Sequence, residues 1–432
     1  MMKRRFCFYR IEMHDVSWTN KFNFGNRNMK IKERKTCRVS GGKLVEVFDL
    51  GMLPISCFPL PNDPSPGTHP LKLAFNKESG LLQLCHTVDP DEMYSQYWYM
   101  SGVNQTMKLA LKNIVDEAMR RSLEPFEKGS VVLDIASNDG TLLGAYPDFL
   151  YRVGIDPAKN IKPKNCDLHI NTYFSKEAYQ SALGDKKAKI VTSIAMFYDL
   201  EDPIKFSQDV ASILSPNGLW IIELSYLPTM LAINSFDTIC AEHLEYYSLQ
   251  SVEQILKRCH LEVEDVELNE VNGGSFRLYV RHAGVAKETE AVKSMRKREK
   301  ELRLTEAETY VAFRQRVEKN KLAMLNFLQT QKRSGKKVIG YGASTKGNTI
   351  LAYYGIGPDL LSFVADRNPI KWGRQTVTRI PIISEEEARK MRPDYFLTFP
   401  YHFMGEFLQR EQDFIMGGGK FISPIPVLSS FP

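Results

Sequence analysis

Residues 132–143 read Val132-Leu133-Asp134-Ile135-Ala136-Ser137-Asn138-Asp139-Gly140-Thr141-Leu142-Leu143, and this stretch decides the fold class. Its apolar first part predicts a buried strand, the small residues after it predict a tight turn, and the leucines predict entry into a helix. Small residues let the backbone approach a ligand closely, and a helix N-terminus offers free N–H groups. The stretch therefore predicts a ligand-binding turn between a strand and a helix.

A second acidic residue points to a nucleoside ligand. Asp156 follows Asp134 by 22 residues and ends the next expected strand, Val153-Gly154-Ile155-Asp156-Pro157. A carboxylate at that place can accept hydrogen bonds from both hydroxyls of a ribose. The sequence has no Gly-x-Gly-x-x-Gly motif, so a pyrophosphate is not the expected ligand. Asp134 instead suits a cationic cofactor without phosphate, such as S-adenosylmethionine. The alternative is an ordinary strand-to-helix turn.

Apolar runs alternate with helix-length segments around this turn, which predicts a parallel sheet. The candidate strands of the first half are 131–135, 153–156, 190–194 and 219–223. A second pattern of this kind gives strands at 338–342, 361–366, 395–398 and 421–422. Residues 285–334 contain neither Gly nor Pro and place apolar side chains at helical spacing, so a long helix or helix pair is expected to join two doubly wound modules.

Composition excludes several classes of protein. The 432 residues are 43% hydrophobic and 25% charged, as in a globular protein, and no run of about 18 apolar residues occurs. The net charge of +6 lies at the N-terminus, where residues 1–36 hold ten Lys or Arg against three acidic residues. The near-neutral remainder gives no reason to expect a nucleic-acid or membrane partner. Seven scattered cysteines without a CxxC motif favour the reducing cytoplasm.

Several separate motifs occur in a fixed order between Cys37 and Pro426. They are Asn138-Asp139-Gly140-Thr141-Leu142-Leu143 and the segments 97–107, 197–203, 237–247, 273–277, 341–348, 366–369 with Lys371, and 400–403. Over nearly the whole chain, these motifs resemble those of the sugar C-methyltransferases that act on nucleotide-linked deoxysugars. The resemblance implies an α/β fold with a class I methyltransferase (Rossmann-like) domain, a second Rossmann-like C-terminal domain and a small N-terminal domain.

The resemblance and the composition together divide the chain into four parts. Residues 1–36 are expected to be a disordered basic extension, and residues 37–100 a small domain that resembles a zinc-binding one. Residues 101–265 are expected to bind S-adenosylmethionine. Residues 266–432 are expected to hold the helical connector and the module that binds the nucleotide-linked sugar.

The resemblance also implies a reaction, in which the carbon next to the ketone of the sugar is methylated, typically C3 of a 4-keto-6-deoxysugar. A general base must remove the α proton, and the enolate oxygen must be stabilised. His243 is implied as the base, with Glu242 beside it and Tyr99 as an enolate contact; the alternative for His243 is a structural histidine. Further implied roles are cofactor binding by Asp134, Ala136, Ser137, Asn138, Gly140, Asp156 and Pro157, and substrate binding by Tyr97, Ser101, Asn104, Tyr226, Tyr246, Lys346, Asn348, Tyr401 and His402.

The chain departs from the family pattern at two places. The family commonly holds zinc with two CxxC pairs, but here these positions read Cys37-Arg38-Val39-Ser40 and Asn76-Lys77-Glu78-Ser79. Ser and Asn are poor zinc ligands, so no metal is expected. A histidine of the catalytic segment is replaced by Ala241, and Cys240 stands where Tyr is frequent.

Two other functions compete with sugar C-methylation. An enzyme of the same fold could methylate an oxygen or nitrogen of another small molecule, and its C-terminal module would then bind no nucleotide. A catalytically impaired protein could bind the cofactor and the nucleotide sugar without turnover, as Ala241 and the lost zinc ligands would suggest. The presence of Asp134, Asp156, Glu242 and His243 at the motif positions counts against the impaired protein. The sequence leaves the sugar, the nucleotide base and the oligomeric state open.

Overall fold

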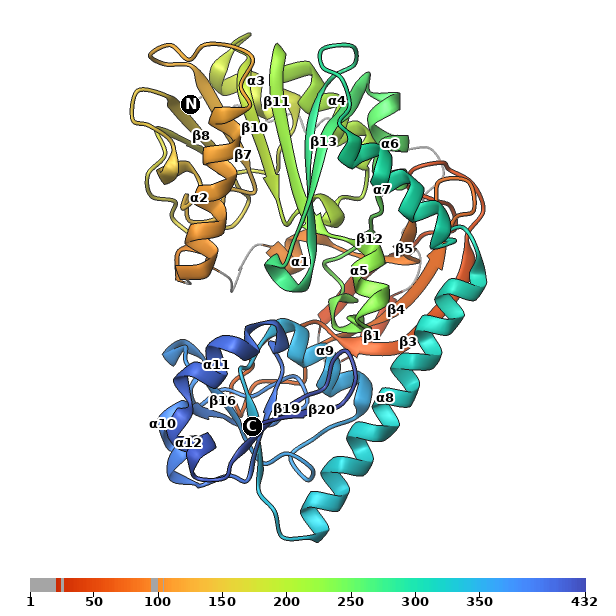
Figure 1. The fold of residues 1–432 in the computed structure, drawn as a ribbon, viewed down its shortest axis with the longest axis vertical. Helices are drawn as coiled ribbons and strands as arrows, with labels where there is room; N and C mark the ends of the chain where they lie inside the picture. The colour runs from red at the N-terminus through yellow and green to blue at the C-terminus, as the bar shows by residue number, and fades with distance from the viewer. Residues whose placement is uncertain (1–20, 25–26, 95–99, 104) are drawn as a thin grey trace, which may run out of the picture.

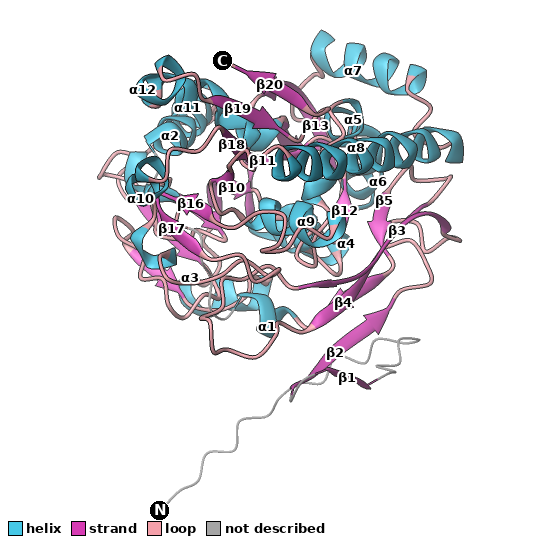
Figure 2. Cartoon of the chain, turned by 90° about the horizontal axis from the view of Figure 1, so that it is seen from below, coloured by secondary structure: helices cyan, strands magenta, loops and turns pink. Residues whose placement is uncertain are grey.

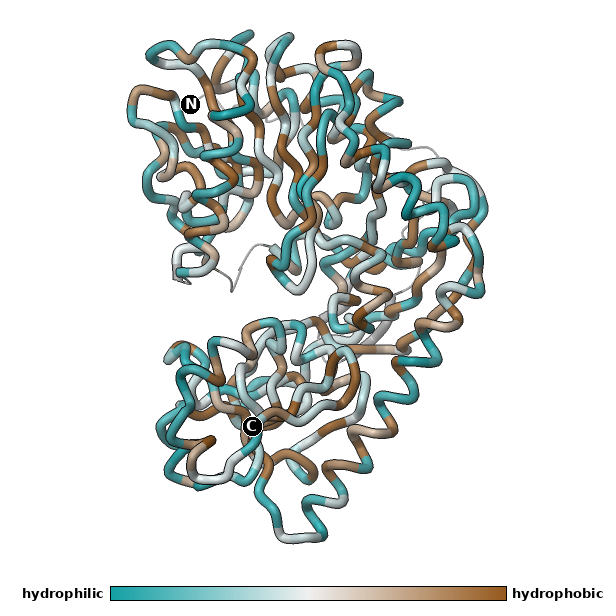
Figure 3. Tube along the Cα trace, viewed as in Figure 1, coloured by the Kyte–Doolittle hydropathy of each residue, from teal (hydrophilic) through white to brown (hydrophobic). Residues whose placement is uncertain are grey.

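Four sheets organise the chain in a computed structural model that describes residues 21–24, 27–94, 100–103 and 105–432. The upper lobe in Figure 1 holds a seven-stranded sheet and the lower lobe a six-stranded sheet. The sheets of the N-terminal part and the long helix α8 (Ala307–Arg333) lie along one side of the two lobes. Brown apolar segments run through the strands of both lobes in Figure 3, whereas teal hydrophilic segments mark the outer helices and loops.

The upper sheet is doubly wound, with the strand order β13-β14-β11-β10-β7-β8-β9. Its pairs are parallel except where β14 lies antiparallel between β11 and β13. Its strands are β7 (Val131–Ile135), β8 (Tyr151–Ile155), β9 (Leu168–Ile170), β10 (Ala188–Ile194), β11 (Leu214–Ser225), β13 (Leu261–Asn269) and β14 (Ser275–His282). The chain reverses direction across the sheet between β7 and β10, and doubly wound sheets bind ligands at the carboxyl ends of such strands.

Helices cover this sheet on both faces, and apolar stripes explain their placement. Apolar spacing over residues 105–122 predicts an amphipathic helix. In α2 (Gln105–Arg120), the predicted face is buried at Leu111, Ile114, Val115 and Ala118, and Met107 is half-buried. The other helices are α3 (Lys176–Leu183), α4 (Pro203–Ile213), α5 (Leu227–Ala232), α6 (Leu249–Arg258) and α7 (Glu290–Glu301). The expected domain limit at 265 falls within β13, and β14 completes the sheet beyond it.

Two local expectations for this lobe are wrong. The turn after β7 leads into a single 3-10 turn at Leu143–Ala145 and not into an α-helix. Tyr146 precedes Pro147 and takes an extended ψ of 148°, because a residue before proline is pushed out of the helical region. Asn217-Gly218 predicts a turn just before the strand at 219–223, but it lies inside β11, beside a shift in the register between β10 and β11.

The lower sheet follows the order β17-β16-β15-β18-β19-β20, and all its pairs are parallel except β19 with β20. This is the strand order of a Rossmann fold, with its switch point between β15 and β18. The strands are β15 (Val338–Tyr341), β16 (Val364–Asp366), β17 (Ile382–Ser384), β18 (Tyr395–Thr398), β19 (Lys420–Ser423) and β20 (Ser429–Phe431). The helices are α9 (Thr345–Tyr354), α10 (Glu385–Lys390), α11 (Met404–Arg410) and α12 (Gln412–Met416).

The N-terminal part forms two small sheets. One has the order β12-β5-β4-β3, with β3 (Val45–Pro54), β4 (Thr68–Phe75), β5 (Leu82–Leu84) and a strand from far along the chain, β12 (Glu245–Tyr246). The other joins β1 (Lys21–Phe24), β2 (Arg27–Glu33) and β6 (His86–Val88), and α1 (Pro90–Tyr94) follows it. Figure 2 shows β1 and β2 at the edge of the molecule. The expectation of disorder up to residue 36 is therefore wrong for β2, whose residues Ile31–Glu33 pair with β6.

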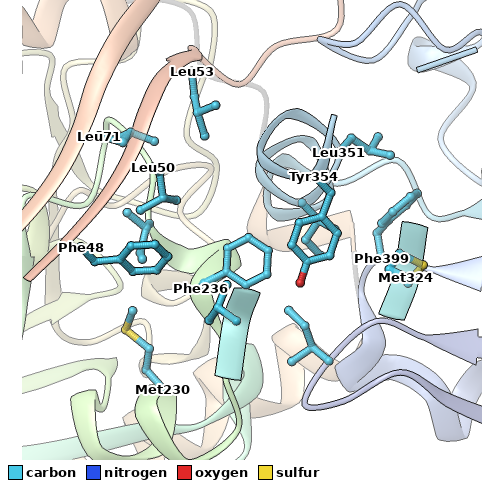
Figure 4. Packing of buried hydrophobic residues seen from close by; sticks show 14 of the residues in the cluster. Phe48, Leu50, Leu53, Leu71, Met230, Phe236, Met324, Leu351, Tyr354 and Phe399 are labelled. Atoms are coloured by element: carbon cyan, nitrogen blue, oxygen red, sulfur yellow. The ribbon is translucent and has the colours of Figure 1, made fainter. Parts of the chain in front are cut away.

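The largest hydrophobic core crosses all these parts. It combines Phe48 of β3, Met230 of α5, Met324 of α8 and Leu351 of α9, and Figure 4 shows its members facing one another. The expected connector forms a helix pair, α7 and α8, and the predicted stripe on α8 is buried at Tyr310, Phe313, Val317, Met324 and Leu328. Within the described ranges, no helix is both long enough and apolar enough to cross a bilayer.

Candidate active site

The turn after β7 has a tightly constrained backbone. Ala136, Asn138 and Gly140 have φ values of 59°, 51° and 76°, in the left-handed region that side chains disfavour. A Cβ atom added at Gly140 would lie 2.1 Å from the carbonyl oxygen of Lys164, so that only glycine fits. The Lys164 backbone thus packs directly against Gly140, and ligand binding at this turn stays a prediction from the sequence.

Asp156 braces this turn from the end of β8. One carboxylate oxygen accepts the Asn138 N–H at 2.8 Å, and the other accepts the Ala158 N–H at 2.8 Å. Pro157 lies between these contacts and is half-buried. The carboxylate keeps free lone pairs, since each ionised oxygen can accept a second hydrogen bond. Asp156 therefore combines a structural role with the capacity to bind ribose hydroxyls.

Asp134 lies at the switch point of the upper sheet, where its carboxylate accepts a hydrogen bond of 2.6 Å from the Thr192 hydroxyl of β10. Burial raises the pKa of Asp134 to about 7, so a cation brought near it would favour the charged carboxylate. The buried Ser137 hydroxyl has no hydrogen-bond partner among the described residues. These features fit S-adenosylmethionine: the carboxyl groups of Asp134 and Asp156, the unpaired Ser137 hydroxyl and the tight backbone of the turn. Segment 134–141 also has no basic residue that would repel a cationic cofactor.

The segment before α2 approaches the same turn. The Ser101 N–H donates to the Asn138 side chain at 3.1 Å, and the Gly102 N–H donates to Asp139 at 2.8 Å. The backbone of Ser101 is thus hydrogen-bonded to the turn after β7. Three predicted site residues, Tyr97, Tyr99 and Asn104, lie outside the described residues.

A small pocket of about 250 Å³, which includes space open to solvent, lies at the carboxyl end of β11. Its enclosed part has room for about one water molecule, far less than a typical site for a drug-sized ligand, so a whole nucleotide sugar does not fit inside it. Its walls are formed by Tyr198, Ser225, Tyr226, Leu227, Met230, Thr238, His243, Glu245 and Tyr246. The predicted residues His243, Tyr226 and Tyr246 are thereby brought together.

His243 has the tautomer that a general base needs. Its Nδ1 lies 2.8 Å from the carbonyl oxygen of Thr238. Because a carbonyl can only accept, Nδ1 carries the hydrogen, and Nε2 of the neutral ring remains an acceptor. Burial, with a smaller contribution from the positive charge of Lys346, lowers the pKa of His243 to about 4, although the hydrogen bond to the Thr238 carbonyl acts in the opposite direction. The ring packs against Tyr198, with 4.3 Å between ring centroids.

Two carboxyl groups lie close to this segment. Burial raises the pKa of Glu242, and burial together with the Glu242 charge raises the pKa of Asp199 well above its usual value. Glu242 Oε2 and Asp199 Oδ1 are buried without a hydrogen-bond partner among the described residues. Hydroxyl groups of a ligand would satisfy both oxygens, because buried polar atoms are normally paired.

The lower lobe contributes Lys346, Tyr401 and His402 to the interface with the upper lobe. Lys346 lies in the first turn of α9, and its Nζ donates to the carbonyl oxygen of Asn272 at 2.7 Å. The Tyr401 hydroxyl lies 2.7 Å from the Ser235 hydroxyl. Burial, with a smaller contribution from Lys346, lowers the pKa of His402 to about 3. These residues lie near the carboxyl ends of β15 and β18, at the switch point of the lower sheet.

Three other positions have mainly structural surroundings. The Tyr226 hydroxyl donates to Glu299 at 2.9 Å, so only its ring is available to the pocket. Asn348 is buried, and its amide donates to Ser56 and to the Cys57 carbonyl. Ala241 packs in an apolar cluster with Ile31, Val88 and Met93, outside the described lining of the pocket.

The two turns that resemble a zinc site are joined directly. This turn cluster consists of Cys37, Ser40, Asn76 and Ser79. Asn76 Oδ1 accepts hydrogen bonds from the hydroxyls of Ser40 and Ser79, both at 3.0 Å, and Cys37 Sγ lies 3.2 Å from the Ser79 hydroxyl. Within the described ranges, no group of three or more His, Cys, Asp or Glu side chains could hold a metal.

Sequence reasoning assigned no role to several side chains near the pocket, namely Arg38, Tyr198, Asp199, Glu201, Asp237 and Glu245. All of them fall within or beside the quoted motifs, which was the only available signal. Asp237 is fully buried, and its Oδ2 lacks a partner among the described residues. The packing of loops from three parts of the chain brings these residues together, and sequence spacing does not reveal that packing.

Known proteins resemble both lobes. A methyltransferase domain family matches residues 107–266, and the C-methyltransferase C-terminal domain family matches residues 270–426. The C-methyltransferase NovU of Streptomyces niveus is 30% identical over 401 residues, which cover 90% of this chain and 95% of NovU.

Among solved structures, two methyltransferases superpose on about two fifths of the chain. A putative methyltransferase from Bacillus halodurans is 13% identical, with a TM-score of 0.31 over 40% of this chain and 99% of its own. Magnesium protoporphyrin IX methyltransferase from Synechocystis, in its form with bound S-adenosylmethionine, is 12% identical, with a TM-score of 0.30 over 42% of this chain and 85% of its own. The domain-family match, together with the strand order, confirms the expected class I methyltransferase fold of the upper lobe.

Proposed function

Since this chain belongs to the C-methyltransferase family and is an S-adenosylmethionine-dependent methyltransferase, we propose that it methylates the carbon next to the ketone of a nucleotide-linked deoxyketosugar. The expected acceptor is C3 of a 4-keto-6-deoxysugar on a nucleoside diphosphate. The product would serve the synthesis of a branched-chain sugar. A reducing compartment, the cytoplasm, suits an enzyme whose six described cysteines are all unpaired.

The tautomer of His243 is the observation that carries this proposal. The Thr238 carbonyl accepts the hydrogen bond from Nδ1 and so fixes the hydrogen on that nitrogen. Nε2 of the neutral ring thus has an acceptor lone pair. Nε2 can therefore take the α proton: the C–H bond breaks, an N–H bond forms, and the electron pair moves into the ketone to give an enolate. Bound S-adenosylmethionine supplies an electrophilic methyl group for the enolate carbon. His243 then returns its proton to solvent.

The cofactor would be held by the turn after β7. Asp156 offers lone pairs to ribose hydroxyls, Asp134 offers a carboxyl group to a cationic part, and Ser137 offers an unused hydroxyl. Ala136, Asn138 and Gly140 supply the close backbone.

The C-terminal lobe supports a nucleotide-linked substrate. Its strand order is that of nucleotide-binding folds, and Lys346, Tyr401 and His402 lie near its switch point, toward the upper lobe. The pocket next to His243 is too small for a nucleotide, so the nucleotide would lie outside it, over the lower lobe. Lys346, in the first turn of α9, is placed to attract a diphosphate.

Hydrogen exchange at the substrate carbon tests the proposal directly. Purified protein is incubated in D₂O with a thymidine diphosphate 4-keto-6-deoxysugar, without cofactor, and deuterium incorporation at C3 is followed by NMR. Cofactor is then added, and the new methyl group is detected on the sugar. His243→Asn should slow both steps by roughly 10²–10⁴ while binding is retained.

The matched control is His260→Asn, which removes an exposed histidine with φ 55°, a conformation that asparagine tolerates. This variant should retain full activity. If His243→Asn retains wild-type exchange, His243 is not the base. If no ketosugar exchanges but cofactor binds, the enzyme methylates another class of acceptor.

A further inference from the structure

We propose that Arg38 is a positioning residue of the active site, which holds the two segments that carry His243 and its ring partner Tyr198 in register. Arg38 is not among the described residues that line the pocket, so it acts through Glu201 and Glu245. The kinetic part of this inference rests on the proposed function.

The turn cluster fixes the backbone of Arg38. The N–H groups of Val39 and Ser40 both point to Cys37 Sγ at 3.4 Å, and the Arg38 N–H donates to the Gln83 side chain at 2.8 Å. Hydrogen bonds to Asn76 then lock this turn against its partner turn. The side chain of Arg38 therefore projects from a turn whose backbone is held in place by hydrogen bonds.

The guanidinium of Arg38 is fully buried and has four acceptors around it. It donates to the Leu84 carbonyl at 2.8 Å and to the Thr87 hydroxyl at 2.7 Å. Its Nη2 lies 3.3 Å from Glu201 Oε2, and its Nε lies 3.5 Å from Glu245 Oε1. Arginine suits this place because its planar group presents five donors in a fixed geometry.

Glu201 and Glu245 belong to the two segments that form the wall of the pocket. Glu201 lies in the loop that follows the 3-10 turn Phe197–Asp199, and this turn carries Tyr198. Glu245 lies two residues after His243 and lines the pocket with it. The Leu244 N–H donates to the Tyr198 carbonyl at 2.8 Å, and the Leu84 N–H donates to the Leu244 carbonyl at 2.9 Å. Arg38 therefore spans the junction at which these segments meet.

The charges at this junction leave Arg38 a distinct role. Lys32 and Arg34 also contact Glu201, at 2.7 and 3.1 Å. Burial would raise the pKa of Glu201, but Arg38 and Arg34, with Lys32 and Thr87, lower it to about 2. Burial raises the pKa of Glu245 well above its usual value, and the charges of Arg38 and Arg34 oppose this shift. Among the described cations, Arg38 is the one within 4 Å of Glu245. Removal of Arg38 would thus leave the Leu244–Tyr198 backbone hydrogen bond in place and take away the side-chain contacts that set how the His243 segment and the Tyr198 loop sit against each other.

Kinetics of variants test the inference. Arg38→Met should lower kcat for exchange at the sugar carbon by about 100-fold, the loss expected when the catalytic group is displaced by about 1 Å. KM for the ketosugar and Kd for S-adenosylhomocysteine should stay nearly unchanged. Arg38→Lys, which retains the charge but not the fork of donors, should recover part of kcat. Arg34→Met is the matched control, because it removes a Glu201 contact and leaves the Arg38–Glu245 pair; its kcat should be close to wild type.

A second variant and a second readout keep the test decisive. Glu245→Met removes the oxygen that faces Arg38 at nearly the same side-chain length, so it provides a second test if Arg38→Met does not fold, and it should show the same loss of kcat. ¹⁵N NMR of labelled histidine reports the His243 tautomer without any substrate, so it decides the role of Arg38 even if no ketosugar reacts. In wild type, Nδ1 should be protonated; in the variants, both tautomers should appear. Wild-type kcat per folded molecule and an unchanged His243 spectrum in both variants would overturn the inference.

Discussion

The low pKa of His243 makes a sharp prediction for the pH dependence of proton removal. A buried histidine with a pKa of about 4 is about 97% neutral at pH 5.5, whereas one with the ordinary pKa of 6.5 is about 9% neutral. Lowering the pH from 7.5 to 5.5 should therefore leave the rate of deuterium incorporation at the sugar carbon almost unchanged. An exposed base would lose about tenfold of its rate over the same interval.

The assay is single-turnover exchange at saturating ketosugar, measured by NMR at both pH values. Circular dichroism at pH 5.5 provides the control that the protein stays folded. Direct NMR titration of His243 should place its midpoint near pH 4. A tenfold fall in rate at pH 5.5 in folded protein, or a midpoint near 6.5, would refute the buried, neutral base described above.

Three further outcomes are expected from other parts of the molecule. The pKa of Glu201 is about 2 in the folded protein and 4.5 in an unfolded chain, so ionised Glu201 adds up to about 3 kcal/mol to the free energy of unfolding above pH 4.5. This contribution is lost as the pH falls from 4.5 to 2. Urea denaturation of Glu201→Gln should therefore show a flatter loss of stability over this window. Gly140→Ala, which forces a Cβ against a carbonyl, should weaken S-adenosylhomocysteine binding in calorimetry by about tenfold or more, whereas Gly405→Ala, in open space, should not change it. A chelator should leave Tm unchanged, and a chelator-sensitive Tm would contradict the absence of a structural metal. Asn76→Ala should lower the free energy of unfolding by about 1–3 kcal/mol, because it removes a buried acceptor shared by several donors.

Strands with continuous apolar runs could be predicted from the sequence because such a run signals burial on both faces, whichever strands lie beside it. The expected strands at 131–135 and 395–398 coincide with β7 and β18. The helix expected after the cofactor turn could not form, since Pro147 forces its neighbour out of the helical region. The sequence contains this proline next to the leucines that favour a helix, and the effect of the proline prevails.

The pocket could be predicted only in part. The motifs identified His243, but not the carbonyl that fixes its tautomer, because the Thr238 backbone reaches the ring through a fold of the loop. The short strand β12 pairs with β5, about 160 residues earlier in the chain, and two residues carry no periodic signal. Asn348 and Tyr226 looked like ligand contacts in sequence, yet hydrogen bonds within the protein already engage their polar atoms.

The apolar core that crosses from β3 through α5 and α8 to α9 has a consequence for how substrate enters. Many two-lobed enzymes swing open about a hinge, but here that motion would pull Phe48, Met230 and Leu351 apart in water. Each such side chain loses about 1.5–3 kcal/mol when it is exposed, so a wide opening of the lobes would be rare. Substrate entry would then depend on smaller shifts than a swing of the lobes. Separate expression of the two family domains would expose this core on both fragments, which would associate with each other or aggregate.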